Sequence, residues 1–168
     1  MQKNCCTIPQ RGEEKMKKTL ACLLCALLLL PLFTQAEEPE TFASGDYKFI
    51  LLEDGTAEIT EYSGNAESLT VPAELDGHSV TSIGNGVLAL HSNLTSVTFP
   101  DGVTSIGNWV FYDCFSLTDI TIPDSVTSIG DWAFSGCDSL TLTVARDSYA
   151  EQYCKENGLA YTYTDGLD

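Results

Sequence analysis

Three consecutive segments decide the fold: VTSIGNGVLALHSNLTSVTFPDG (80–102), VTSIGNWVFYDCFSLTDITIPDS (103–125) and VTSIGDWAFSGCDSLTLTVARDS (126–148). The period is 23 residues, and five columns keep their character in all three copies: Val80, Val103 and Val126; Ile83, Ile106 and Ile129; Gly84, Gly107 and Gly130; Leu88, Phe111 and Phe134; Leu94, Leu117 and Leu140. Such spacing is typical of repeat proteins, in which each unit buries its apolar edge against its neighbours. We therefore expect a solenoid in which like side chains stack in register.

Each copy is expected to supply one short strand and its turns, which makes the fold mostly β. The stretches LTSVTF (94–99) and LTDITI (117–122) alternate apolar and polar positions, so one side of each strand should face the core. Pro100 and Pro123 follow and, lacking an N–H donor, should end the ladder. The glycine column indicates either a positive φ or a close backbone approach. The next column, with Asn85, Asn108 and Asp131, lies where the N-cap of a short helical turn is expected.

Both ends of the array need caps, because the outermost copies lack one neighbour. The stretch YKFILLEDGTAEITEY (47–62) holds two β-rich runs around Asp54-Gly55, which predicts a β-hairpin. At the other end, Ser148 to Glu151 fits a capping box and Asn157-Gly158 fits a helix stop, with a last strand near 159–163. We assign 37–46 to an acidic linker, 47–79 to the hairpin and an irregular first turn five residues longer than a repeat, 80–147 to three leucine-rich repeats, and 148–168 to a C-terminal helix cap and tail.

The N-terminus carries an export signal. From Met16 the chain reads MKKTLACLLCALLLLPLFTQA, a short basic start and an apolar run before a small residue, which predicts a signal peptide cleaved after Ala36. The apolar run is shorter than the roughly 20 residues that a spanning helix needs. Residues 1–15 fit no secretory pattern, so we interpret them as an upstream extension and Met16 as the true start. The mature protein is expected to be secreted or to lie at the cell surface.

The chain is strongly acidic, with 24 Asp and Glu against 8 Lys and Arg. After residue 36, 22 acids and 3 bases remain (Lys48, Arg146 and Lys155), a net charge of 3 − 22 = −19. Such a chain cannot neutralise a phosphate backbone, and we expect no nucleic acid partner and no membrane insertion after the signal is removed. A partner is expected to be a protein or a surface ligand of still unknown identity.

Catalytic and metal-binding chemistry is poorly represented after residue 36. Only His78 and His91 remain as histidines, without a serine elbow, a zinc motif or a phosphate-cradling loop. We therefore expect no enzyme, no cofactor and no metal site. Cys114 and Cys137 lie one period apart, within reach of a disulfide if the copies stack, although buried free thiols are the commoner arrangement, and Cys154 is expected to be buried likewise.

The repeat core V-T-S-I-G-x-x-A-F-x-x-C-x-x-L-T-x-I-x-I-P-x-S resembles the BspA-like leucine-rich repeat family of bacterial surface and secreted proteins. The resemblance implies a curved solenoid used for protein or surface recognition, some members acting as adhesins, and no common catalytic residues. Three positions depart from the pattern: His91 replaces Cys, Leu88 replaces Phe, and Arg146 replaces Pro.

Two groups of side chains are candidates for binding. Trp109 and Trp132 share one column, and with Tyr112 they are expected to form a flat aromatic strip for a partner protein or a sugar ring, or else to shield the stack. The solvent side of the strands presents Thr98, Asp119 and Thr121, which suit a basic partner, although Thr also has high strand propensity.

The sequence thus predicts a non-catalytic exported binding module that mediates protein recognition or adhesion. Two alternatives stay open: a structural or self-associating module that pairs through its end strands, and carbohydrate binding through Trp109 and Trp132.

Overall fold

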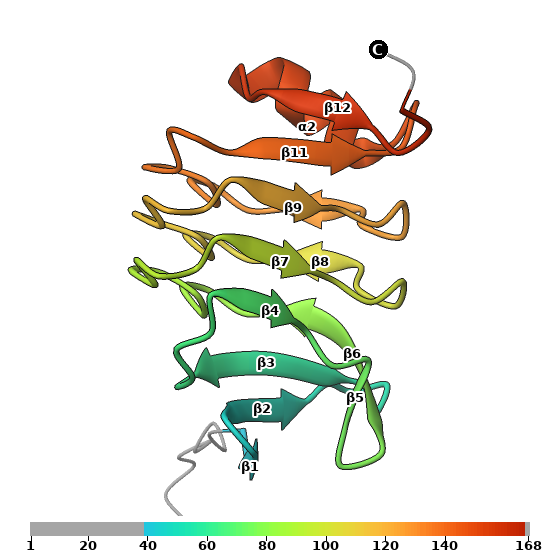
Figure 1. The fold of residues 1–168 in the computed structure, drawn as a ribbon. Coiled ribbons are helices and arrows are strands. Elements are labelled where there is room, and N and C mark those ends of the chain that lie inside the picture. Colours follow the sequence, from blue (N-terminus) through green and yellow to red (C-terminus); the bar gives the residue numbers. More distant parts are fainter. Residues whose placement is uncertain (1–38, 167–168) are drawn as a thin grey trace, which may run out of the picture. The chain divides into compact units, whose positions relative to one another are not determined.

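The computed structural model describes residues 39–166, which fold into two sheets and one helix (Figure 1). The first sheet has the order β1 (Thr41–Ser44), β2 (Tyr47–Leu51), β3 (Ala57–Tyr62), β6 (His78–Ile83), β8 (Ser105–Ile106) and β10 (Ser128–Ile129), with β5 (Glu74–Leu75) paired to β6. The second has the order β4 (Ser68–Thr70), β7 (Ser96–Thr98), β9 (Asp119–Thr121), β11 (Thr141–Val144) and β12 (Tyr161–Tyr163). The helix is α2 (Tyr149–Asn157).

The chain winds between the two sheets in about five turns, which confirms the solenoid. Successive turns run from β3 to β4, β6 to β7, β8 to β9 and β10 to β11, and in the last turn α2 precedes β12. Parallel pairing aligns the repeats in register: Ile83 pairs with Ile106, and Ile106 with Ile129. The three repeats recognised in the sequence are therefore the middle of a longer series.

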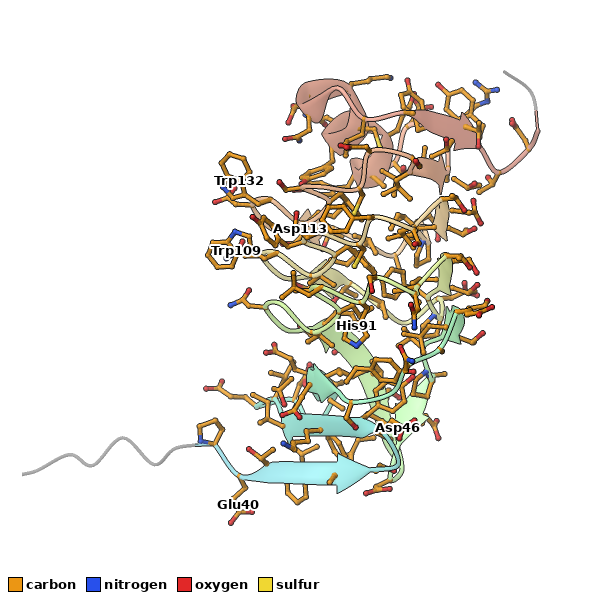
Figure 2. The ribbon with its side chains drawn as sticks, turned by 60° about the vertical axis from the view of Figure 1, so that its left-hand side comes forward. Glu40, Asp46, His91, Trp109, Asp113 and Trp132 are labelled. Atoms are coloured by element: carbon orange, nitrogen blue, oxygen red, sulfur yellow. The ribbon has the colours of Figure 1, made fainter. Side chains whose placement is uncertain are left out.

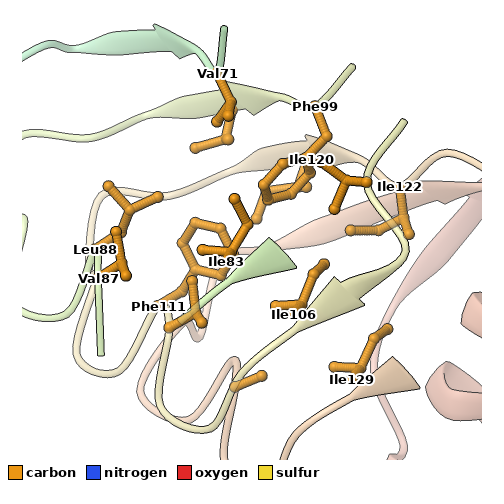
Figure 3. Close-up of a cluster of buried hydrophobic side chains, with 14 of the residues drawn as sticks. Val71, Ile83, Val87, Leu88, Phe99, Ile106, Phe111, Ile120, Ile122 and Ile129 are labelled. Atoms are coloured by element: carbon orange, nitrogen blue, oxygen red, sulfur yellow. The ribbon is translucent and has the colours of Figure 1, made fainter. Parts of the chain in front are cut away.

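The core is a set of apolar columns between the two sheets (Figure 3). Leu94, Leu117 and Leu140 are 1%, 0% and 7% exposed. The rings of Phe111 and Phe134 stack with centroids 5.5 Å apart and planes within 6°. Each turn therefore buries its apolar edge against the turns beside it, as repeat architectures require.

The glycine column marks a close backbone approach. None of its members has a positive φ, and the Gly107 N–H donates to the Ile83 carbonyl at 2.8 Å. A Cβ on Gly107 would lie 2.9 Å from the backbone nitrogen of Asn85. Only glycine lets neighbouring turns come this close.

The predicted helical turn after each glycine is wrong. These segments are tight turns, and the Asn column links neighbouring turns instead of capping a helix. The Asn85 side-chain oxygen accepts from the Asn108 N–H at 2.8 Å, and that of Asn108 accepts from the Asp131 N–H at 2.7 Å. A side chain that accepts a bond from the next turn leaves nothing to start an intrahelical ladder.

The N-terminal cap contains the expected hairpin and two elements that the sequence analysis missed. β2 and β3 are antiparallel, and β3 also pairs parallel with β6. Part of the predicted linker 37–46 is instead strand β1, which precedes β2, is joined to it by a turn at Gly45, and is held by stacking of Phe42 on Phe49 at 5.4 Å. The irregular first turn is a second hairpin, in which Asp76 and Gly77 both have positive φ between β5 and β6.

The C-terminal cap is helix α2, as expected. Ser148 accepts from the Glu151 N–H at 3.2 Å, and Gly158 ends the helix in the left-handed conformation. Ala150 and Cys154 are buried, whereas Tyr149 is 42% exposed. Arg146, at the position of the missing proline, pairs with Asp165 at 2.9 Å and lies 3.7 Å from the Tyr163 ring centroid, so it secures the last turn.

The basic residues of the described chain are confined to the two caps. Lys48 pairs with Glu61 in the N-terminal cap, and Arg146 and Lys155 belong to the C-terminal cap. Between residues 49 and 145 the sequence contains neither Lys nor Arg. The turns between the caps therefore carry uncompensated negative charge.

The predicted signal peptide, its cleavage after Ala36 and the start at Met16 fall outside the described residues. Within 39–166, no helix is long and apolar enough to cross a membrane.

Candidate binding surface

The most exposed large apolar side chains lie along one edge of the solenoid, which we call the turn edge. It consists of the segments 85–92, 108–115 and 131–138, which lead from the first sheet to the second. Its exposed members are Leu90 (68%), Trp132 (66%), Phe115 (62%), Trp109 (48%) and Tyr112 (39%). Trp109 and Trp132 project from this edge in neighbouring turns (Figure 2). Exposed apolar groups gathered in this way are characteristic of interaction sites.

Hydrogen bonds between neighbouring turns hold the turn edge in place. The N–H groups of Gly86, Leu88 and Leu90 donate to the carbonyls of Asn108, Val110 and Tyr112 at 2.9, 3.0 and 2.8 Å. The next segment repeats the pattern, with Trp109 donating to Asp131 at 3.1 Å. The exposed side chains therefore stand on a backbone that is fixed by its neighbours.

Trp109 and Trp132 occupy a strained backbone conformation. Their φ angles are 55° and 59°, and the first repeat has glycine, Gly86, in this column with a φ of 67°. A left-handed conformation costs an L-residue about 1–2 kcal/mol, and it is unusual for a bulky side chain. Leu90, the most exposed side chain of this edge, also has a positive φ, of 64°. Strain of this kind clusters at functional sites, so Leu90 and the two indoles are the strongest candidates on this edge.

The polar candidates lie on a different element, the outward side of the second sheet. Thr98 and Asp119 are exposed and Thr121 is half-buried. One outward column consists entirely of threonine, with Thr70, Thr98, Thr121, Thr143 and Thr162 paired in register. The structure thus places Trp109, Trp132 and Tyr112 on the turn edge, where no ring contact joins them within residues 39–166, and places Thr98, Asp119 and Thr121 on the sheet.

Sequence reasoning missed a pocket of about 710 Å³ beside the last turn segment. It lies between 131–135 and α2, and its wall includes Trp132, Tyr149, Asp131 and Glu156. The spacing of the repeats carries no signal for it, because α2 departs from the 23-residue pattern.

The cysteines are unsuited to nucleophilic chemistry. Cys114, Cys137 and Cys154 are free and buried, and the thiols of Cys114 and Cys137 donate to the carbonyls of Leu88 and Phe111 at 3.0 and 3.1 Å. Burial raises the pKa of Cys137 to about 12 and that of Cys154 to about 11. Residues 39–166 also contain no group of three His, Cys, Asp or Glu side chains placed to hold a metal ion.

Comparison with known families identifies this architecture. A family model described as a BspA type leucine-rich repeat region, of six copies, matches residues 41–154. The chain belongs to the BspA-type leucine-rich repeat family. The resemblance seen in the repeat core is thereby confirmed, and the match extends over both hairpins and into α2. A comparison with curated proteins found no match.

Solved structures of leucine-rich repeat proteins are similar to this chain. A leucine-rich cell surface protein from Faecalibacterium prausnitzii A2-165 is 40% identical, with a TM-score of 0.59, over 64% of this chain and 31% of that one. A leucine-rich repeat protein from Bacteroides capillosus is 33% identical, with a TM-score of 0.57, over 64% of this chain and 84% of that one. One from Bacteroides ovatus is 27% identical, with a TM-score of 0.54, over 61% and 31%.

Proposed function

We propose that this chain is a non-catalytic binding module, exported to the cell surface or beyond, that recognises another protein through its turn edge. The observation that carries the proposal is the set of five exposed large apolar side chains on that edge, three of which, Leu90, Trp109 and Trp132, have a strained backbone conformation. Aromatic anchors on a rigid support are typical centres of protein interfaces. The description of the F. prausnitzii relative as a cell surface protein supports the location.

The acidic surface adds a preference for basic partners. The turns between the caps carry no Lys or Arg, so a partner with a positive patch gains long-range attraction and associates faster at low salt. Apolar anchors supply affinity, and the surrounding carboxylates select among partners.

A pull-down tests the turn edge. The immobilised full chain serves as bait, and the protein that the wild-type chain captures is compared with what two variants capture. The double variant Leu90→Ser, Phe115→Ser is expected to lose the captured protein, because both side chains are more than 60% exposed and their loss leaves the core intact. The matched control Thr98→Ala, Thr121→Ala changes two side chains of the second sheet and should retain it. Equal capture by all three proteins would reject the turn edge as the binding surface.

Self-association is a second candidate, favoured by the end strands. The first sheet ends in β1 and β10 and the second in β4 and β12; each of these strands pairs with a single strand, and such edges can pair with another copy. Light scattering of the full chain over a range of concentrations tests self-association, and a monomer throughout excludes it.

Carbohydrate recognition is favoured instead if the wild-type chain binds a glycan and the double variant Trp109→Gly, Trp132→Gly does not.

A further inference from the structure

The pocket beside the last turn segment lies where the solenoid departs from its repeat. In the stack, the segments 85–92 and 108–115 are each succeeded by another turn segment. In the turn that succeeds the segment 131–138, the helix α2 takes that place. Tyr153 anchors the helix there: its hydroxyl donates to the Gly130 carbonyl at 3.2 Å, and its ring meets that of Phe134 edge-on at 6.1 Å. The helix thus closes the core but leaves an opening of about 710 Å³ along the turn edge, a size common among ligand sites.

Two backbone donors in this pocket lack the acceptors that their counterparts have. In the preceding segment the N–H groups of Trp109 and Phe111 donate to Asp131 and Ala133 at 3.1 and 2.8 Å. The equivalent donors one turn later belong to Trp132 and Phe134. Among residues 39–166 neither has a hydrogen-bond acceptor, because α2 supplies no carbonyls at this position. Unpaired N–H groups of this kind favour a ligand that brings carbonyl oxygens.

The pocket also attracts positive charge. Asp131 ends the Asn column, and no later turn supplies an N–H for its side chain, as Asp131 itself does for Asn108. Glu156 places a second carboxylate on the helix side, and no lining residue is basic. Trp132 and Tyr149, 66% and 42% exposed, present aromatic rings on the same wall. Rings beside carboxylates suit a guanidinium, which stacks on aromatic faces and pairs with carboxylates.

We propose that this pocket binds a loop of the partner protein that carries an arginine. The guanidinium lies against Trp132 and Tyr149 and pairs with Asp131 and Glu156, while loop carbonyls accept from the N–H groups of Trp132 and Phe134. The inference rests on the proposed function and adds the chemistry of the partner. The ligand in effect replaces the turn segment that the helix displaces.

A matched pair of peptides tests the proposal. The full chain, labelled with ¹⁵N, is titrated with acetyl-Gly-Gly-Arg-Gly-Gly-amide and with the same peptide containing citrulline, which keeps the shape of arginine without its charge. The arginine peptide is expected to bind about tenfold more tightly than the citrulline peptide, and its affinity should fall as the salt concentration rises. Its binding is expected to shift the amide resonances of residues 131–135.

Variants copied from the earlier repeats keep the fold intact. Asp131→Asn restores the residue type of Asn85 and Asn108, and Trp132→Gly restores that of Gly86. Each is expected to weaken the arginine peptide about tenfold. Asp124→Asn removes an exposed carboxylate from the turn after β9, outside the pocket, and should leave the affinity unchanged.

Equal affinity for both peptides, no effect of Asp131→Asn, or shifts confined to other residues would overturn the proposal. Binding of N-acetylglucosamine at the same amides without arginine binding would overturn it as well. If the captured partner is lost with Leu90→Ser, Phe115→Ser yet fully kept with Asp131→Asn, the turn edge stands and the pocket inference fails.

Discussion

Trp109 and Trp132 each have a left-handed backbone conformation, which glycine adopts more easily than any other residue. The column tolerates glycine, since Gly86 fills it in the first repeat with the same backbone geometry. Packing does not explain the indoles, which are about half and two-thirds exposed. Side chains that add strain and little burial are expected to contribute to binding more than to stability.

Replacing these tryptophans should reveal the strain. Trp109→Gly is expected to be more stable than Trp109→Ala by about 1 kcal/mol, because Ala keeps the left-handed penalty and Gly removes it. Against the wild type, Trp109→Gly should change the free energy of unfolding by less than about 1 kcal/mol. Urea unfolding followed by circular dichroism measures both differences. A loss of several kcal/mol in the Gly variant would mean that the indole is part of the packing.

At the scale of elements, the glycine column sets how closely the strands of the first sheet and their turns approach. Gly107→Ala is expected to destabilise the protein by about 1–3 kcal/mol, because the new methyl group meets backbone atoms of Asn85 and Gly84 at 2.9 Å. Gly102→Ala is the control, since its nearest contact would be 3.5 Å and its φ is not positive. Urea midpoints measure both, and equal midpoints would disprove the close-approach interpretation.

Helix α2 carries a pH dependence in its buried acid. The Lys155 ammonium at 2.6 Å and the Tyr163 hydroxyl at 2.6 Å lower the pKa of Glu151 to about 2. An unfolded Glu titrates near 4.3, so between these pKa values the unfolded state binds more protons. The contribution of Glu151 is complete above about pH 5 and is lost as the pH falls towards 2.

The variant Glu151→Gln tests this dependence. Its free energy of unfolding is expected to fall less than that of the wild type between pH 5 and pH 2, because Gln takes up no proton. Lys155→Gln should give an intermediate slope, since it removes the first cause of the low pKa. Parallel curves for wild type and Glu151→Gln over this range would show that the carboxylate is not coupled to folding.

Local signals predicted the elements wherever the 23-residue columns or strong turn residues apply. The columns located the repeats, and Asp54-Gly55 located the hairpin of β2 and β3. The same Asp-Gly signal is present at Asp76-Gly77, where the five extra residues predicted an irregular turn instead of a hairpin. The predicted role of Asn108 was wrong, because a helix N-cap and a hydrogen bond to the N–H of the next turn both require the same short side chain with an acceptor oxygen. Only the alignment of neighbouring turns distinguishes the two roles.

At the scale of the whole molecule, stability depends on contacts between neighbouring turns. A second copy of residues 103–125 inserted after residue 125 adds one full interface and keeps every column. The enlarged protein is expected to unfold with a higher free energy and with a urea m-value larger by about a fifth, in proportion to the added surface. An unchanged m-value would mean that the extra turn does not join the stack.

The binding surface was only partly predictable from the sequence, because the repeat columns report only on contacts between one repeat and the next. The exposure of Trp109 and Trp132 followed from their variable column, since a position that accepts glycine cannot be needed for the core. The pocket did not follow, because it exists where α2 meets Asp131 and Trp132, and contacts between a repeat and a non-repeating cap leave no periodic trace in the sequence.

The confinement of Lys48, Arg146 and Lys155 to the caps has a consequence for digestion of the protein. Trypsin-like proteases cut after basic side chains, which their specificity pocket selects by charge. Within the described chain such an enzyme finds its cleavage points only in the two caps, and everything from residue 49 to residue 145 survives as one fragment even when unfolded.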